Sequence, residues 1–163
     1  MYKLQRFCGL LAALLLSTNI YAADIEIEGA WIRATAPGQE MAMMDLSITS
    51  KQPAILLGIT SAVSRTVEMH SMTHENGMMK MREVKEIEVP AGRRFNLGES
   101  GYHLMLDGLK APLKEGEIVP LTLSIKAGNQ GAVKIEAKAE VRSRTATKPS
   151  SDDEDNHMHM QMK

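Results

Sequence analysis

Apolar and polar residues alternate along most of the chain between residues 24 and 142. Residues 24–34, for example, read Asp-Ile-Glu-Ile-Glu-Gly-Ala-Trp-Ile-Arg-Ala. A period of two is typical of half-buried strands, and no window shows a sustained helical period. Further strands are predicted at residues 40–50, 54–61, 65–72, 78–84, 86–89, 93–97, 102–107, 118–126 and 132–141. Short strands at such intervals predict an all-β fold, a sandwich of antiparallel sheets.

One of these connections predicts a β-hairpin whose register the sequence leaves open. The turn His-Glu-Asn-Gly at residues 74–77 separates two strands. A four-residue loop would place His70 opposite Met81, whereas a two-residue Asn-Gly loop would place Met72 opposite Met81 and His70 diagonal to it. Both registers put His70 and Met81 on one face, and a loop of three or five residues would separate them.

The two ends of the chain differ in composition from the segment between them. Residues 1–22 have the features of a cleavable signal peptide: Lys3 and Arg6 precede an apolar run at 9–16, and small residues follow it. Cleavage is expected after Ala22 or Ala23, which predicts export. Residues 23–142 are expected to form one domain. Residues 143–163 form an acidic, His/Met-rich tail that lacks the apolar content to join a core.

Charge and cysteine usage narrow the chemistry. The net charge is −1, and the basic residues form no stripe, so a nucleic-acid partner is not expected. The only cysteine, Cys8, precedes the Leu-rich run and should leave with the signal peptide. Histidine and methionine remain usable as metal ligands in an oxidising compartment, where free thiols would be oxidised.

Imidazole and thioether side chains occur at strand spacing on both sides of the hairpin turn. The candidates are His70, Met81, His103 and Met105. His103 and Met105 are two residues apart in one strand and therefore point to the same face. Soft sulfur and borderline nitrogen ligands without a thiolate suit copper, Cu(I) above all. The pattern predicts a copper site on a sheet surface, accessible for metal transfer.

The spacing of these four residues resembles the His-x10-Met-x21-His-x-Met motif of the PCuAC family of periplasmic copper chaperones. The flanking segments that share the resemblance are 31–35, 68–70, 78–81, 89–92, 101–106, 108–110 and 112–116. The resemblance covers about residues 24–141 and implies a cupredoxin-like, Greek-key sandwich or barrel. It implies one Cu(I) bound by His70, Met81, His103 and Met105.

The resemblance also implies what such a site is for. PCuAC proteins are thought to deliver copper to the Cu(A) centre of cytochrome c oxidase, directly or with Sco-type proteins. We therefore expect a periplasmic, monomeric carrier that is not an enzyme and has no membrane span in the mature chain. The alternatives are a copper buffer or resistance protein that sequesters the metal and, more weakly supported, a small copper oxidase.

The remaining histidines and methionines are predicted to have roles outside the four-ligand site. An auxiliary site for Cu(II) or a second Cu(I) is expected in the tail, at His157, Met158, His159, Met160 and Met162. The other methionines of the strands, namely Met41, Met43, Met44, Met69 and Met79, are predicted to pack in the core. His74 is predicted to be a loop residue. Met72 could shield or load the metal, and Glu68 either orients His70 or is simply exposed.

Overall fold

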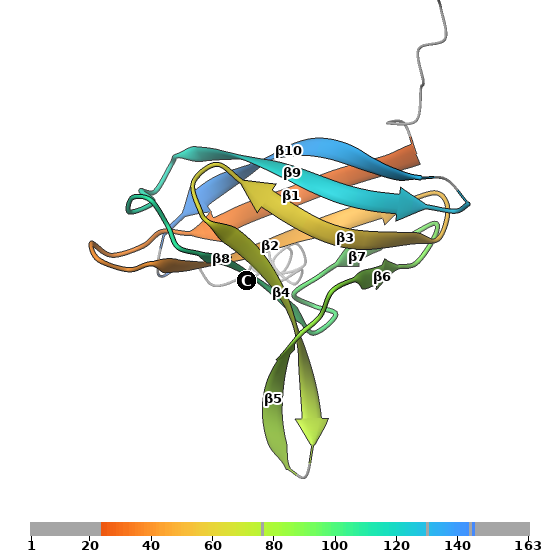
Figure 1. The fold of residues 1–163 in the computed structure, drawn as a ribbon, viewed down its shortest axis with the longest axis horizontal. Helices are drawn as coiled ribbons and strands as arrows, with labels where there is room; N and C mark the ends of the chain where they lie inside the picture. The colour runs from red at the N-terminus through yellow and green to blue at the C-terminus, as the bar shows by residue number, and fades with distance from the viewer. Residues whose placement is uncertain (1–23, 76, 130, 144, 146–163) are drawn as a thin grey trace, which may run out of the picture.

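The computed structural model describes residues 24–75, 77–129, 131–143 and 145. The expected signal peptide and the five tail ligands lie outside the described residues. The described chain forms ten strands, which confirms the all-β prediction (Figure 1). They are β1 (Ile25–Arg33), β2 (Met41–Ser50), β3 (Ala54–Ser61), β4 (Thr66–Glu75), β5 (Met78–Glu83), β6 (Ile87–Val89), β7 (Arg94–Asn96), β8 (Tyr102–Asp107), β9 (Ile118–Ala127) and β10 (Ala132–Arg142).

The strands follow one another in the order β5-β4-β8-β2-β1-β10-β9-β3-β6, and β7 also pairs with β2. Most pairs are antiparallel, as expected, but β1 and β10 are parallel, with Trp31 opposite Glu140. The sheet is therefore mixed. Apolar alternation reports which face a residue occupies but carries no information about strand direction, so the sequence could not predict the parallel pair.

The hydrophobic core is built from alternate residues of the longer strands. Met44, Met69, Leu104 and Leu106 contribute to it from β2, β4 and β8. Their neighbours along each strand point to the opposite face of the sheet, because successive side chains alternate. The prediction that Met69 packs in the core is confirmed. The outward face of β4, β8 and β2 is thereby left to the residues between the core positions.

The predicted packing of β2 is partly wrong. Met44, Leu46 and Ile48 are buried, but Met41 is exposed and Met43 is only partly buried. Met41 and Met43 lie at odd positions, and Leu46 and Ile48 at even ones, so the two sets cannot share a face. The strand therefore presents Met43 on the outward side.

Strands β4 and β5 form a hairpin that projects from the body of the domain (Figure 1). β4 continues to Glu75, which pairs with Met78, so the loop contains only residues 76 and 77. Gly77 has a φ of 79°, the conformation that a two-residue turn of this kind requires. Every residue of β5 is exposed, and β5 is an edge strand paired only with β4.

We predict that Leu104→Ala destabilises the domain by about 2–5 kcal/mol, because it removes buried methyl groups and leaves a cavity. Leu104 is fully buried between the outward-facing His103 and Met105. Urea unfolding followed by circular dichroism would measure the change. The control, Leu57→Ala, alters an exposed leucine of β3, and equal losses for the two variants would contradict this placement of the core.

Candidate metal centre

Two of the predicted copper ligands face each other across the β4–β8 pair. His70 is directly opposite His103, and directly opposite residues point to the same face with Cα atoms about 4.5–5.5 Å apart. The register is held at one end by Arg65, whose guanidinium lies 2.6 Å from the Asp107 carboxylate. At the other end the Met72 amide donates a hydrogen bond to the Gly101 carbonyl (2.8 Å).

The other predicted ligand on β8, Met105, lies two residues further along the same face of the strand. Met105 is opposite Glu68 on β4 and opposite Met43 on β2. His70, His103 and Met105 are all partly buried. We call the surface they share the His/Met face. It comprises Met43, Glu68, His70, Met72, His74, Met79, Met81, Glu83, His103 and Met105.

Met81 is the outermost of the four predicted ligands. It lies opposite Met72, and Glu83 lies opposite His70, so the two-residue-loop register is observed and the four-residue alternative is wrong. Met81 is therefore diagonal to His70 on the same face, and its side chain is 52% exposed. The register thus brings His70, His103 and Met105 to neighbouring positions of one face, and Met81 lies diagonal to His70 at the exposed edge of that face.

Glu68 contacts the imidazole of His70, with 3.0 Å between Oε2 and Nε2. A neutral ring that donates its Nε2–H to this carboxylate keeps its lone pair on Nδ1. Metal-binding histidines are commonly oriented by a carboxylate on the second ring nitrogen. Of the two possibilities left open for Glu68, the structure shows the contact with His70. The His70 side chain is 17% exposed, so this contact orients a partly buried ring.

A small hollow of about 210 Å³ adjoins His103 and is also lined by Trp31, Met43 and Asp45. Asp45 is buried and holds the loop that precedes β8. Its Oδ1 accepts hydrogen bonds from the amides of Gly98 (3.0 Å) and Leu46 (2.8 Å). A side-chain carbon at position 98 would lie 2.9 Å from Asp45 Oδ2, so this close approach requires glycine. The loop positions the start of β8 and hence His103.

Three residues of the His/Met face were assigned other roles from the sequence. Met43 was predicted to be core but lies opposite Met105. His74 was predicted to be in the loop but belongs to β4, opposite Met79. Met79 was also predicted to be core and is 61% exposed. For His74 and Met79 the sequence held an indication, since each is an even number of residues from a predicted ligand on the same strand. Met43 had none, because β2 carries no predicted ligand.

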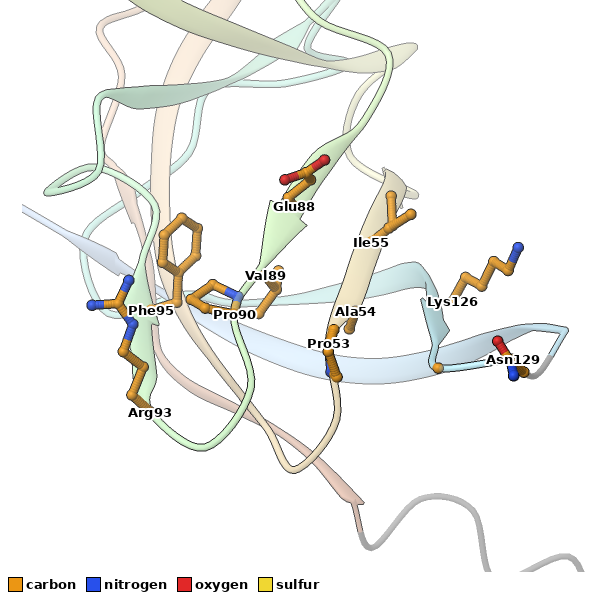
Figure 2. A pocket seen from close by; sticks show the side chains of 11 residues that line it. Pro53, Ala54, Ile55, Glu88, Val89, Pro90, Arg93, Phe95, Lys126 and Asn129 are labelled. Carbon is orange, nitrogen blue, oxygen red and sulfur yellow. The ribbon is translucent and has the colours of Figure 1, made fainter.

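A larger hollow of about 660 Å³ lies at the β3–β6 end of the strand order, remote from β5. Figure 2 shows its lining, which includes Phe95, Val89 and Pro90 and the charged side chains of Glu88 and Lys126. The residues that surround it include no histidine, methionine or cysteine. This hollow therefore lacks the soft ligands that the His/Met face provides.

Harder metal-binding chemistry is not indicated. Among the described residues, no group of three or more His, Cys, Asp or Glu side chains is placed to hold a metal ion. The His/Met face adds thioethers to its imidazoles, and thioethers select soft ions. The described part of the chain also contains no helix long and apolar enough to cross a membrane.

Comparisons with known proteins identify the family. The chain belongs to the family described as "Putative lipoprotein LpqE-like", which matches residues 25–139. A relative from Leifsonia xyli subsp. xyli (strain CTCB07), "Putative lipoprotein Lxx21020", is 33% identical over 118 residues, covering 72% of this chain and 71% of the relative.

Solved structures of PCuAC domains share the fold. The apo PmoF2 PCuAC domain has a TM-score of 0.58 and 25% identity, and the match covers 76% of this chain and 93% of that domain. CuI-DR1885 from Deinococcus radiodurans has a TM-score of 0.54 and 31% identity, covering 70% of this chain and 75% of that one. The cupredoxin-like architecture expected from the sequence is thereby confirmed.

We predict that Asp45→Ala lowers the free energy of unfolding by about 2–3 kcal/mol, because it leaves the buried amide of Leu46 and the partly buried amide of Gly98 without their charged acceptor. Chemical denaturation would measure this loss. Asp24→Ala is the matched control, since Asp24 makes only a surface ion pair with Lys51 (2.9 Å) and should cost about 0–1 kcal/mol. An Asp45→Ala variant as stable as the control would contradict an anchoring role.

Proposed function

We propose that this protein is a periplasmic Cu(I) carrier whose metal is bound by His70, His103, Met105 and Met81. The observation that carries the proposal is the pairing of His70 with His103. It sets two imidazoles on one surface with Met105 beside them and an exposed thioether at their edge. Two neutral imidazoles and two thioethers form a soft ligand set without a cysteine, which suits Cu(I).

The comparisons support copper as the cargo. DR1885, 31% identical to this chain, has been solved with Cu(I), and PmoF2 contributes a further PCuAC domain of the same fold. The chain's family and its Leifsonia relative bear lipoprotein names, which is consistent with export. We propose that residues 1–22 direct this export, that 23–142 form the carrier domain and that the tail from 143 supplies an auxiliary copper site.

The geometry suggests how copper would be transferred. Met81 is more exposed than the two imidazoles, and a thioether is a weak ligand. A thiolate or imidazole from a recipient could therefore displace Met81 first and bind copper before the remaining ligands dissociate. The ion would pass between proteins without becoming free. For the recipient we propose the Cu(A) site of cytochrome c oxidase, reached directly or with Sco-type proteins.

Anaerobic Cu(I) titration against a chromophoric chelator tests the proposal. The mature protein should bind one ion tightly at the four-ligand site, and His70→Ala/His103→Ala should abolish the binding of that ion, because it removes both imidazoles. A chain ending at Thr147 should retain it. Binding that is lost on truncation and kept in the double variant would favour the alternative function, a copper buffer that sequesters metal through its tail.

The contact between Glu68 and His70 generates a second prediction. Glu68→Ala should weaken Cu(I) binding about 10–100-fold, because the imidazole loses the partner that fixes its orientation. The same chelator competition would measure the affinity. Glu88→Ala removes an exposed carboxylate from β6 and should leave the affinity unchanged. Equal affinities for both variants and the unmodified protein would show that Glu68 does not position His70.

A further inference from the structure

The outer part of the β4–β5 hairpin holds an imidazole–thioether contact beyond the four proposed ligands. His74 and Met79 are directly opposite each other, and His74 Nδ1 lies 3.3 Å from Met79 Sδ. The next pair toward the body of the domain is Met72 with Met81. All four side chains belong to the His/Met face, because their positions on each strand differ by two residues.

The distance between the two atoms suits a shared soft ion. With metal–nitrogen and metal–sulfur bonds of about 2.0 and about 2.3 Å, lengths typical of zinc, a 3.3 Å separation corresponds to an angle of about 100° at the metal. That angle is close to tetrahedral. When no metal is bound, a proton on His74 Nδ1 can lie between the nitrogen and Met79 Sδ as a hydrogen bond. The two side chains can therefore be in contact without an ion.

The reverse face of the hairpin holds this geometry in place independently of metal. Glu75 accepts hydrogen bonds from Lys80 (3.1 Å) and Arg82 (2.8 and 3.0 Å). These residues alternate with those of the His/Met face, so both cations are paired on the side away from His74 and Met79. The hairpin thus separates its ion pairs from its soft ligands.

We propose that His74, Met79 and Met72 form a second Cu(I) site near the tip of the hairpin. The two thioethers select a soft monovalent ion over harder cations. Met79 is 61% exposed, so an ion there is accessible from solvent or from a docked protein. Met81 lies opposite Met72 and adjacent in position to both sites. We call these three residues the tip site. That copper binds there before or after it occupies the four-ligand site rests on the proposed carrier function.

The experiment is an anaerobic Cu(I) titration of the full mature chain, followed by NMR of the methionine methyl groups and histidine rings. The resonances of His74, Met79 and Met72 should shift in a binding step separate from that of His103 and Met105. His74→Asn/Met79→Leu should reduce the amount of bound Cu(I) by one ion per chain. Met78→Leu is the matched control, because Met78 is 62% exposed on the opposite face of the same hairpin.

Each outcome decides the inference separately from the proposed function. If the His74 and Met79 resonances do not move, or if the pair variant and Met78→Leu bind equal amounts, the tip site does not exist. If the His74 and Met79 resonances shift in the His70→Ala/His103→Ala variant as they do in the unmodified chain, the tip site binds Cu(I) independently of the four-ligand site. Failure of the proposed function would instead leave the His103 and Met105 resonances unmoved in the unmodified chain. Unchanged Ser71 and Arg82 amide shifts would verify that the pair variant keeps its hairpin, because these two residues pair across it.

Discussion

The antiparallel pairing of β4 with β8 is the constraint on which the rest of the site depends. A slip of one residue would turn His103 into the core and Leu104 out to solvent. The ion pair between Arg65 and Asp107 helps to mark this register, but an exposed pair of this kind is worth only about 0–1 kcal/mol. Burial of a leucine such as Leu104 contributes about 1.5–3 kcal/mol. The apolar face therefore determines which residues the outward face presents.

The β4–β5 hairpin lies beyond the core and is stabilised differently. β5 has no apolar layer against either face, and all six of its residues are exposed, so burial cannot fix its conformation. Its stability must come from pairing with β4, from the tight turn at Gly77, and from the ion pairs of Glu75 with Lys80 and Arg82. Because these stabilising contacts occupy one face, the other can carry methionines whose side chains remain free to rearrange.

The sequence predicted the strands well because their alternation is a local property. The bounds of β3 and β8 agree with the prediction, and Leu104 and Leu106 are buried as the alternation of β8 implies. The hairpin register was narrowed to two alternatives, since the segment 74–77 is compatible with more than one turn. What distinguished them was the length of β4, which continues through His74 to Glu75.

The errors have a common physical origin in non-local pairing. Met43 was predicted to pack because methionine in a strand usually does, but the identity of its neighbour, Met105, depends on β2 pairing with β8 across 61 intervening positions. Met79 looks equally apolar in the sequence and is exposed because no other part of the domain covers either face of β5. Alternation assigns residues to two faces, whereas only the sheet order decides which face is covered.

The order of exposure across the His/Met face bears directly on how a carrier could release its ion. The imidazoles lie closer to the body of the domain, and His70 is held by Glu68, while Met81 and Met79 extend outward on a strand with no covering layer. Of the four proposed ligands, the two imidazoles and Met105 are partly buried, and the thioether of Met81 would meet an approaching protein first. A site with the opposite order would expose its imidazoles to competition and bury the ligands that must leave. In the proposed carrier, copper exchange would begin at the hairpin without disturbing the β4–β8 pair.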